Sequence, residues 1–474
     1  MSARFSLEQA AAAAAARVVS AGSAVAFEGV FTDTRAPIPG GLFVALQGEN
    51  FDGASFAAEA VKKGATGVLV PAASLPRVQV DAAILAAADT TRALGGLGRA
   101  FRGRHPDLRV VCITGSAGKT STKELIAEVL AASGPTLKTE GNLNNEIGVP
   151  LTLLKLESTH RFAAIECGMN HLGEIARLAS YADPDVAVVT NVGPVHLEGC
   201  GSLAGVGYAK GELFHALRPT GIAVANADDP HALQQARLSR HKLITFGAAR
   251  TSDVRLLSAH HGGKGLLLEL SIAGHKRDVE LQLIGTHNGH NAAAAAAVGL
   301  ALGLDEDAIV RGLAAARTPG RRMRPVQLPG GGLLIDDCYN ANPTSTKAAL
   351  LTLTHLVRGK GRAIAVLGDM LELGATENDL HRDVGRFAAG AGLSLLVCFG
   401  KRAREIGEGA IEAGLREAFV QYAEDPAEAV RLVRASAQPE DVILVKGSRG
   451  MRMERISDPL IGAPGASAAK PGGH

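Results

Sequence analysis

A buried strand, a short glycine loop and an amphipathic helix follow one another in VVCITGSAGKTSTKELIAEVL, residues 110–130. This order is typical of a phosphate cradle, because glycines let backbone N–H groups close around an anion and the new helix presents its positive end. Lys119 would lie against the β- and γ-phosphates and the Thr120 hydroxyl against Mg²⁺. The longer pattern G-x-x-x-x-G-K-[ST] is not met, since Ile113 stands at its first position, and the loop has the shorter form T-G-x-x-G-K-T. The segment predicts an ATP site, with an ordinary strand-to-helix turn carrying a surface lysine as the alternative.

Alternating strand and helix patterns along the 474-residue chain predict an α/β fold with three domains. Residues 1–89 form a small N-terminal α/β domain in this interpretation, and residues 90–317 form a central P-loop domain with a parallel sheet covered on both faces. A third strand and helix series predicts a Rossmann-like C-terminal domain over residues 318–474. Its last residues, from about 463, are small and proline-bearing, so we expect a flexible tail there.

The composition excludes several classes of function. Lysine and arginine total 49 against 47 acidic residues, a net charge of +2, so no strong field would steer the chain onto nucleic acid or anionic lipid. Tryptophan is absent and aromatic residues make up 4%, which argues against base-stacking platforms and an aromatic membrane belt. The five cysteines are scattered singly, and no apolar run of about 18 residues occurs. We therefore expect a cytoplasmic protein with no nucleic-acid partner and no stable membrane insertion.

Further segments beyond the glycine loop carry a resemblance to a known family. In chain order they are TGSAGKTSTKE, EGNLNNEIGVPLTLL, ECGMNHLGEI, TNVGPVHLEGCGSLAGVGYAKGELF, GTHNGHNAAAA, PGRR, DDCYNANPTS, LGDMLELG and VKGSRG. Together they resemble the Mur ligases, the ATP-dependent amide-forming enzymes of peptidoglycan synthesis, over nearly the whole chain. The resemblance implies three α/β domains, in agreement with the strand pattern. Within the family it is nearest to the members that join D-alanyl-D-alanine to the tripeptide carboxylate of UDP-N-acetylmuramoyl-tripeptide through an acyl phosphate.

The resemblance implies a catalytic and metal-binding set for two Mg²⁺ sites. Lys119 and Thr120 lie in the glycine loop, and Glu166, at the end of a buried strand, would be a Mg²⁺ ligand. His196 would serve the second Mg²⁺. Lys210 would be carbamylated by CO₂, which turns a cation into an oxygen-bearing anion that can hold a metal. From the residues alone, Glu166 could equally be a capping or solvated glutamate. For His196 and Lys210, the residues alone favour a loop histidine and a solvated helix lysine.

The resemblance also implies the ATP-binding residues. Asn288 and Asn291, three apart at the start of an alanine-rich helix, would contact the adenine, although helix capping is the alternative for both. Arg321 would lie beside the phosphates, with Arg322 as its nearby competitor, and Asp337 would meet the nucleotide from the C-terminal domain. The glycine loop contributes Gly115, Ser116, Ala117, Gly118, Lys119, Thr120 and Ser121.

Two groups of residues would bind the substrates, according to the same resemblance. The uridine end would meet the N-terminal domain and an asparagine-rich loop, and the dipeptide would meet the segment VKGSRG. A turn-forming role is the alternative for each asparagine and aspartate. The first group is Asp33, Thr34, Arg35, Asn50, Asp52, Asn142 and Asn145, and the second is Lys446, Ser448 and Arg449.

Several other functions stay open from the sequence. A sibling Mur ligase that adds another residue, or a folylpolyglutamate synthetase-like ligase, would share most of the segments above. The asparagine-rich GNLNNEIGVP and the lack of a DNPR-like motif in the third domain favour D-alanyl-D-alanine addition. A P-loop kinase or GTPase-like switch would not need Glu166, His196 and Lys210 together, and a scaffold with a decayed nucleotide site would not keep them. We also expect a monomer whose three domains close around the substrates.

Overall fold

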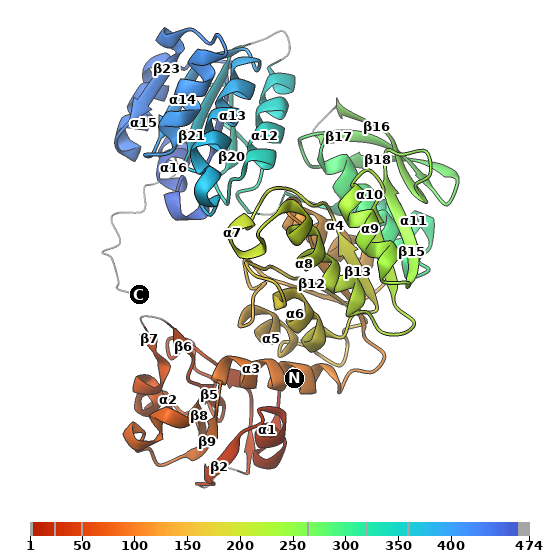
Figure 1. Ribbon diagram of the computed structural model, residues 1–474, viewed down its shortest axis with the longest axis vertical. Coiled ribbons are helices and arrows are strands. Elements are labelled where there is room, and N and C mark those ends of the chain that lie inside the picture. The colour runs from red at the N-terminus through yellow and green to blue at the C-terminus, as the bar shows by residue number, and fades with distance from the viewer. Residues whose placement is uncertain are drawn as a thin grey trace.

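The structure is a computed structural model that describes residues 3–22, 25–48, 51–262, 265–318, 320–357 and 361–462. Figure 1 shows an N-terminal domain at the bottom, a central domain in the middle and a C-terminal domain at the top left. Each has a largely parallel sheet with helices packed against it, which confirms the predicted α/β fold. The predicted substrate residue Asn50 and the predicted flexible tail lie outside the described residues.

The N-terminal domain is built on a sheet whose two central strands are apolar throughout. GVLVP and AILAA are buried at every position, as expected for parallel strands that are covered on both faces. The sheet order is β2 (Arg17–Ser20), β9 (Ala83–Ala87), β8 (Gly67–Pro71), β5 (Leu42–Val44) and β4 (Val30–Phe31), with β2 antiparallel to β9. The remaining elements are α1 (Leu7–Ala13), α2 (Ala57–Lys62), η1 (Gly53–Phe56), η2 (Ala72–Arg77), and the pairs β1 (Phe5–Ser6) with β3 (Ala26–Phe27) and β6 (Gln47–Gly48) with β7 (Phe51–Asp52).

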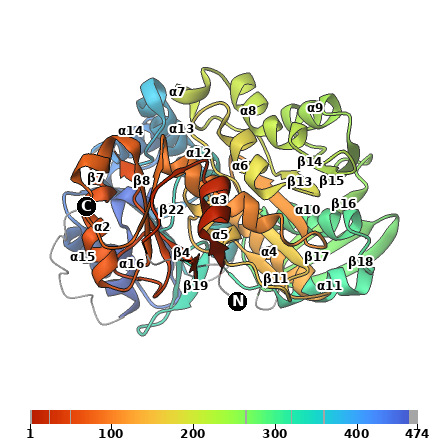
Figure 2. The ribbon, with the colours of Figure 1, turned by 90° about the horizontal axis from the view of Figure 1, so that it is seen from below.

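Helix α3 (Thr90–Arg102) joins the N-terminal domain to the central domain. Asp89 caps it by accepting hydrogen bonds from the N–H groups of Thr91 and Arg92, at 2.8 and 3.0 Å. The helix packs against α1 on one side and against α5 (Gly148–Leu153) and α6 (Glu174–Ala182) on the other, and it lies between the two domains in Figure 2. One continuous hydrophobic core therefore runs from the N-terminal sheet to the central sheet.

The central domain has a nine-stranded sheet that places apolar side chains on both faces. On β10 (Arg109–Thr114), Val110 and Cys112 enter one core, and Val111 and Ile113 enter the other. The sheet order is β11 (Thr136–Lys138), β12 (Phe162–Glu166), β10, β13 (Val186–Val189), β14 (Ile222–Asn226), β15 (Lys242–Gly247), β16 (Val254–Gly262), β17 (Gly265–Ile272) and β18 (His275–Leu281). Helices α4 (Lys119–Ala131), α10 (Asn288–Ala301) and α11 (Glu306–Ala315) cover one face, and α5, α6, α8 (Leu203–His215) and α9 (Pro230–Leu238) cover the other.

One end of the central sheet is antiparallel. The segments GLLLELSIAG and KRDVELQLIG predict a pair of antiparallel strands, and β17 and β18 confirm it. Strand β16 adds a third antiparallel member that the sequence analysis did not predict. Its pattern is weak, because only some of its residues are buried. The short helix α7 (Leu197–Cys200) begins directly after His196.

The C-terminal domain has a six-stranded sheet with helices on both faces. The sequence pattern predicts five strands here, in LLIDDCYN, RAIAVLGD, LSLLVCFG, AFVQYA and DVILVKGS, and all five are present. The antiparallel edge strand β19 (Arg324–Gln327) is additional. The order is β19, β20 (Leu333–Asp337), β24 (Val442–Lys446), β21 (Ala363–Gly368), β22 (Leu393–Phe399) and β23 (Val420–Ala423). One core packs α12 (Pro343–Leu356), α13 (Glu377–Ala389) and α14 (Ala403–Glu412), and the other packs α15 (Pro426–Ser436) and α16 (Glu454–Ile461); the short turns are η3 (Gly374–Thr376), η4 (Glu417–Phe419) and η5 (Arg449–Met451).

The three large sheets lie within residues 17–87, 109–281 and 324–446. The exact domain boundaries, after residue 89 and after residue 317, stay predictions. Among the described residues, no helix combines the length and the apolar character that crossing a membrane requires.

Arg102 at the end of α3 supports the junction between the first two domains. Its side chain is 2% exposed, and it donates hydrogen bonds to the carbonyls of Ala182 (3.1 Å), His105 (2.8 Å) and Leu108 (3.3 Å). Arg102→Met keeps most of the volume but removes these donors, so we expect a loss of about 2–3 kcal/mol in the free energy of unfolding.

This loss corresponds to a thermal midpoint lower by roughly 4–10 °C, measured by calorimetry. The exposed Arg99, on the same helix, is the matched control, and Arg99→Met should leave the midpoint within about 2 °C. An Arg102→Met midpoint equal to that of the unchanged protein would contradict this role.

Candidate active site

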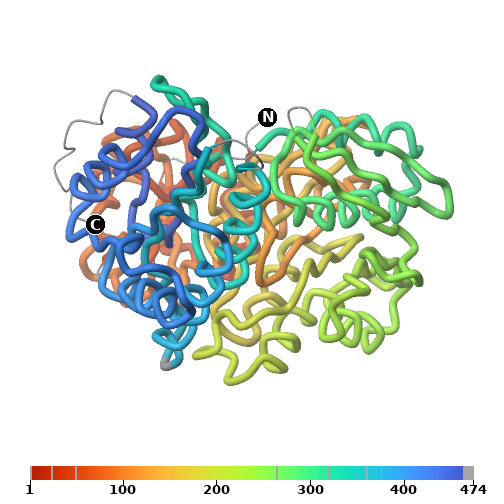
Figure 3. Tube along the Cα trace, turned by 90° about the horizontal axis from the view of Figure 1, so that it is seen from above, coloured from red at the N-terminus to blue at the C-terminus, as the bar shows by residue number. Residues whose placement is uncertain are grey.

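A cavity of about 900 Å³ lies where the carboxyl ends of the central strands meet the C-terminal domain. Its walls come from the glycine loop, the ends of β12 and β13 and the start of α10 on one side, and from residues 322–348 and the end of β24 on the other. Figure 3 shows these two domains side by side. In parallel sheets, ligands gather at the carboxyl ends of strands where the strand order reverses, and β10 is such a point, with β12 and β13 on its two sides.

The glycine loop has the geometry of a phosphate cradle. Gly115 and Gly118 adopt φ angles of +154° and +79°, which L side chains rarely adopt, and a Cβ on Gly118 would approach Asn291 Oδ1 to 2.7 Å. Helix α4 starts at Lys119 with no side-chain cap on its first N–H groups. These N–H groups and the positive end of the helix are therefore directed toward an anion.

Residues 190–193, after β13, hold the glycine loop in place. Asn191 accepts hydrogen bonds from Ser116 N (3.0 Å, on its backbone oxygen) and from Ala117 N (2.9 Å, on Oδ1). Thr190 Oγ1 and Asn191 Nδ2 both donate to the carbonyl of Ala117, at 2.7 and 3.0 Å. Ser116 Oγ accepts from Gly193 N at 2.8 Å. The loop is therefore preorganised, and Thr190 and Asn191 are site residues that the sequence analysis did not assign.

Lys119 points its ammonium group along the inside of the loop. Its Nζ donates to the carbonyl of Gly115 at 2.7 Å. Burial lowers the pKa of Lys119, the nearby Glu166 carboxylate raises it, and the Arg322 guanidinium lowers it further. A cation held in this position favours a phosphate group, whose negative charge would offset the cost of burying the ammonium.

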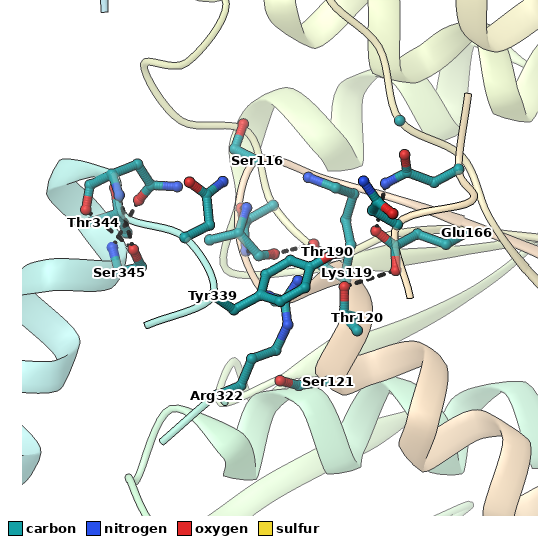
Figure 4. Close-up of a pocket in the computed structure, with 18 of the residues that line it drawn as sticks. Ser116, Lys119, Thr120, Ser121, Glu166, Thr190, Arg322, Tyr339, Thr344 and Ser345 are labelled. Carbon is teal, nitrogen blue, oxygen red and sulfur yellow. Dashed lines mark hydrogen bonds between the residues drawn. The ribbon is translucent and has the colours of Figure 1, made fainter. Parts of the chain in front are cut away.

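Glu166, at the end of β12, lies against the first turn of α4. Its two carboxylate oxygens accept hydrogen bonds from Thr120 Oγ1 at 2.7 Å and from Asn144 Nδ2 at 2.9 Å, and it is 2% exposed (Figure 4). Mg²⁺ takes oxygen ligands and is usually held by one or two protein groups, phosphate oxygens and waters. Thr120 and Glu166 fit that set. Within the described residues, no group of three or more histidine, cysteine or acidic side chains could hold a metal on its own.

The two residues predicted for a second Mg²⁺ lie nearby but do not form a complete ligand set. His196 lines the cavity, and burial, together with the charges of Lys119 and Lys210, lowers its pKa to about 4, so its imidazole is neutral at pH 7. Lys210, on α8, does not line the cavity, is 1% exposed, and makes no hydrogen bond or ion pair within the described part of the chain. Burial and the charge of Lys119 lower the pKa of Lys210 well below its usual range.

Asn288 and Asn291 form one buried polar group at the start of α10. Asn291 Nδ2 donates to Asn288 Oδ1 at 2.8 Å, Asn288 Nδ2 donates to the carbonyl of Ile284 at 2.8 Å, and Thr122 Oγ1 donates to Asn291 Oδ1 at 3.1 Å. Both asparagines line the cavity, next to the glycine loop. Neither caps the helix with its side chain, so their adenine contact stays a prediction that their position favours.

The C-terminal domain contributes an ion pair at the edge of its sheet. Asp337 and Lys446 are register partners at the ends of β20 and β24, and Lys446 Nζ donates to Asp337 Oδ2 at 2.6 Å and to the carbonyl of Asn340 at 2.8 Å. Both residues line the cavity. The sequence analysis expected Asp337 to meet the nucleotide and Lys446 to meet the dipeptide, and the structure pairs the two residues with each other.

The sequence analysis expected Arg321 beside the phosphates, but the structure places it outside the cavity. Its guanidinium pairs with Asp336 at 3.1 Å and with Asp458 at 2.8 Å, and it does not line the cavity. Arg322 lines it instead, with its guanidinium 3.9 Å from the centroid of the Tyr339 ring (Figure 4). The buried Asp336 and the partly exposed Asp458 hold Arg321 away, so the phosphate role passes to Arg322 as a proposal.

The remaining predicted substrate residues fall into two sets. Asn142, Asn145 and Arg449 line the main cavity, and Ser448 lines a smaller pocket beside it. Asp33, Thr34, Arg35 and Asp52 line neither pocket. They belong to the N-terminal domain, where Asp33 pairs with Arg35 at 2.8 Å and Asp52 with Arg77 at 3.0 Å.

The comparison with known proteins follows the same three-domain order. Residues 26–102 match the model described as Mur ligase family, catalytic domain, residues 113–299 match the Mur ligase middle domain, and residues 321–449 match the Mur ligase, glutamate ligase domain. The chain belongs to the Mur ligase family. It is 42% identical over 438 residues to UDP-N-acetylmuramoyl-tripeptide--D-alanyl-D-alanine ligase of Escherichia coli (strain K12), covering 92% of this chain and 94% of that protein.

Two solved structures are similar to this Mur ligase over most of their length. A crystal structure of MurF from Acinetobacter baumannii has a TM-score of 0.88 and 33% identity, covering 97% of this chain and 99% of that chain. The MurF ligase from Thermotoga maritima, solved in complex with ADP, has a TM-score of 0.81 and 27% identity, covering 91% and 97%. This enzyme is therefore an ATP-dependent ligase of the Mur family.

Some residues of this ligase's site were within segments that the sequence analysis quoted but did not assign. Asn144 lies in GNLNNEIG, Thr190 and Asn191 in TNVGPVH, and Tyr339 in DDCYNAN. Polar residues that follow a buried strand were the available signal. Which of them contact the glycine loop depends on the order of the strands in the sheet, and sequence patterns do not indicate that order.

Lys119→Ala tests the phosphate cradle. Removal of the ammonium group leaves the phosphate charge without its nearest cation, so we expect turnover to fall at least about 100-fold. The fold should persist, because Lys119 makes only one hydrogen bond to the described residues and its burial is unfavourable for the charge. An assay of ATP-dependent ligation measures the turnover, and the thermal midpoint of unfolding shows whether the fold persists.

The exposed Lys401, in the C-terminal domain, supplies the control, since Lys401→Ala should retain turnover. A Lys119→Ala protein that ligated at the unchanged rate would refute the assignment of the cradle.

Proposed function

We propose that this ligase joins D-alanyl-D-alanine to the tripeptide carboxylate of UDP-N-acetylmuramoyl-tripeptide, with ATP as the energy source. The observation that carries the substrate assignment is the similarity, along nearly the whole length of both chains, to the Escherichia coli ligase named for that reaction. The cavity between the central and C-terminal domains is the place where ATP and the two substrates would meet.

The reaction needs activation because a carboxylate is a poor electrophile. A tripeptide carboxylate oxygen attacks the γ-phosphorus of ATP, the bond from that phosphorus to the β,γ-bridging oxygen breaks, and ADP leaves. The neutral amine then attacks the acyl carbon, the nitrogen loses a proton to water, and the tetrahedral intermediate releases inorganic phosphate, which carries the carboxylate oxygen. Lys119, the first N–H groups of α4 and Arg322 would stabilise the negative charge on the transferred phosphoryl group.

The Mur family fold implies Mg²⁺, and the chain offers residues for it. Thr120 Oγ1 and Glu166 would hold one ion, which would neutralise phosphate charge when bound. Asn144 supports this position, because its donated hydrogen bond orients the Glu166 carboxylate. The second predicted Mg²⁺ position rests on His196 and on a modified Lys210.

We propose that Lys210 carries the carbamate that the second position needs. The neutral amine attacks CO₂ and loses a proton, which gives a carbamate with two oxygens. The lowered pKa of Lys210 supports this reaction because only the neutral amine has a free electron pair. The residue's lack of a partner within the described chain leaves its Nζ free to react.

The carbamate predicts that turnover depends on CO₂. In CO₂-depleted buffer, the rate should fall by roughly 10-fold or more, and added bicarbonate should restore it. Lys210→Arg, which keeps the charge but does not form a carbamate, should have a low rate that bicarbonate does not change. A rate that is indifferent to CO₂ depletion in the unchanged protein would contradict the carbamate.

The substrates would contact all three domains. We propose that the N-terminal domain binds the uridine end through residues near Asp33 and Asp52, and that Asn142 and Asn145 contact the same substrate at the cavity. Because Asp33 and Asp52 do not line the cavity, this substrate must span two domains, and we propose that the domains close on it. A cytoplasmic monomer, with no nucleic-acid partner, remains our prediction, and the five cysteines, all free and buried, agree with a reducing compartment.

The alternatives are less well supported. A sibling Mur ligase or a folylpolyglutamate synthetase-like enzyme would have the same cradle, but the relatives described above are named for D-alanyl-D-alanine addition or as MurF. A P-loop kinase or switch would need neither the C-terminal domain nor its cavity residues.

Phosphate release tests the proposed reaction. With ATP, Mg²⁺ and UDP-N-acetylmuramoyl-tripeptide, sustained release should require D-alanyl-D-alanine, and mass spectrometry should show the pentapeptide product. Release that depended on glutamate or a diamino acid would identify a sibling enzyme, and no release with any acceptor would contradict the ligase assignment.

A further inference from the structure

One carboxylate at the active site has no partner in the described chain. Five carboxylates line the main cavity and the smaller pocket beside it. Four of them have an ion pair or accept hydrogen bonds, whereas Glu372, which lines both pockets, has neither among the described residues. The four with partners are Glu146 with Arg177, Glu166 with Thr120 and Asn144, Glu174 with Asn170 N, and Asp337 with Lys446.

The smaller pocket, of about 170 Å³, adjoins the phosphate cradle. The central domain contributes Ser116, Lys119 and His196 to its wall, and the C-terminal domain contributes the segments 371–373 and 448–450. The acyl phosphate forms next to Lys119, so the attacking amine must approach from a space that touches Lys119. The smaller pocket is such a space, and Glu372 supplies its one carboxylate within the described residues.

The backbone that leads to Glu372 is fixed by hydrogen bonds to three different elements. Met370 N donates to Nε2 of the buried His381 on α13 at 2.9 Å, and Leu371 N donates to Ser448 Oγ at 2.9 Å. Asp369 accepts from Ser448 N at 3.0 Å and, on Oδ1, from Ala403 N at 2.7 Å. The main chain that carries the Glu372 side chain is therefore held in place before any substrate binds.

Glu372 itself has an unfavourable backbone conformation. Its φ is +64°, in the left-handed region that favours glycine, and its side chain is exposed. A residue with a bulky side chain in this region points to a role for that side chain when it lies at a ligand site. The next turn, η3, packs against α7, so this loop also lies at the junction of the two domains.

We propose that Glu372 binds the ammonium group of the incoming amine substrate and thereby holds its nitrogen toward the acyl phosphate. The bound ammonium releases a proton to water before the free amine attacks. The inference rests on the proposed function and names the residue that selects a zwitterionic acceptor. Arg449, in the same pocket, donates from Nη1 to Glu454 at 3.0 Å, and its remaining guanidinium donors provide the cation for the opposite end of the dipeptide. Lys446 is not available for that task, because Asp337 and the carbonyl of Asn340 hold its ammonium group.

Glu372→Gln tests this role because it keeps the size of the side chain and removes its charge. We expect the KM for D-alanyl-D-alanine to rise roughly 10- to 100-fold, the range for a lost charge-assisted hydrogen bond. The KM values for ATP and UDP-N-acetylmuramoyl-tripeptide should stay within about 2-fold. Glu440→Gln is the matched control, since Glu440 is also an exposed glutamate of the C-terminal domain with a positive φ, +79°, and lines neither pocket.

A second measurement separates binding of the ammonium group from a structural effect on the loop. N-(D-lactoyl)-D-alanine has a hydroxyl group in place of the ammonium group and keeps the carboxylate, so it can be tested as a competing ligand that lacks only the positive charge. Its inhibition constant should be nearly the same for the unchanged enzyme and for Glu372→Gln, while the KM for D-alanyl-D-alanine differs. The same rise for both compounds would show a distorted pocket and overturn the proposal.

The remaining outcomes are equally decisive. A Glu372→Gln enzyme with an unchanged KM for D-alanyl-D-alanine, or an equal effect of Glu440→Gln, would overturn the role of Glu372 and leave the proposed function intact. If the unchanged protein did not ligate D-alanyl-D-alanine at all, the proposed function would be wrong, and the inference would fall with it.

Discussion

The hydrogen bonds between the glycine loop and residues 190–193 are the contact on which the rest of the site depends. They fix Ser116 and Ala117 against Asn191 and so determine where α4 begins. The start of α4 in turn places Lys119 inside the loop and Thr120 against Glu166. Without this contact, the glycines at 115 and 118 would leave the loop free to adopt many conformations, and the anion site would have to be ordered by its ligand.

The second constraint is that the cavity belongs to two sheets. The carboxyl ends of β10, β12 and β13 carry the residues proposed to bind phosphate and metal, and the carboxyl ends of β20, β21 and β24 carry Asp337, the loop to Glu372, and Lys446. Neither sheet alone surrounds the place where phosphoryl transfer and amine attack would occur. The N-terminal domain is connected to the central sheet by α3, whose buried Arg102 donates a hydrogen bond to the carbonyl of Ala182.

Local signals explain what could be predicted from the sequence. The strand, loop and helix at 110–130 are adjacent in the chain, so the sequence alone predicts the cradle. The continuous apolar runs of β12 to β15 and β20 to β24 indicate buried parallel strands. The short or half-buried strands β11, β16 and β19 lack such a pattern. Lys119 and Thr120 were predicted from the glycine-loop segment itself, whereas the metal role of Glu166 was implied by the family resemblance.

Tertiary pairing decided the rest. Arg321 and Arg322 are neighbours, and only the acidic residues Asp336 and Asp458, folded against Arg321, show which of the two lines the cavity. Asp337 and Lys446 are 109 residues apart, and only the β20–β24 register brings them together. Asn191 meets Ala117 across 74 residues for the same reason. Sequence patterns indicate that such residues are polar and follow strands, but not which partner each one meets.

The central claim is that the carboxylate is activated by phosphoryl transfer at the Lys119 cradle. The most direct test uses UDP-N-acetylmuramoyl-tripeptide with ¹⁸O in the carboxylate that becomes the new amide, and follows the label by mass spectrometry. The account predicts that each phosphate released during ligation carries one ¹⁸O atom, because the attacking carboxylate oxygen leaves with the phosphoryl group. Pentapeptide formation with no ¹⁸O in the released phosphate would contradict it.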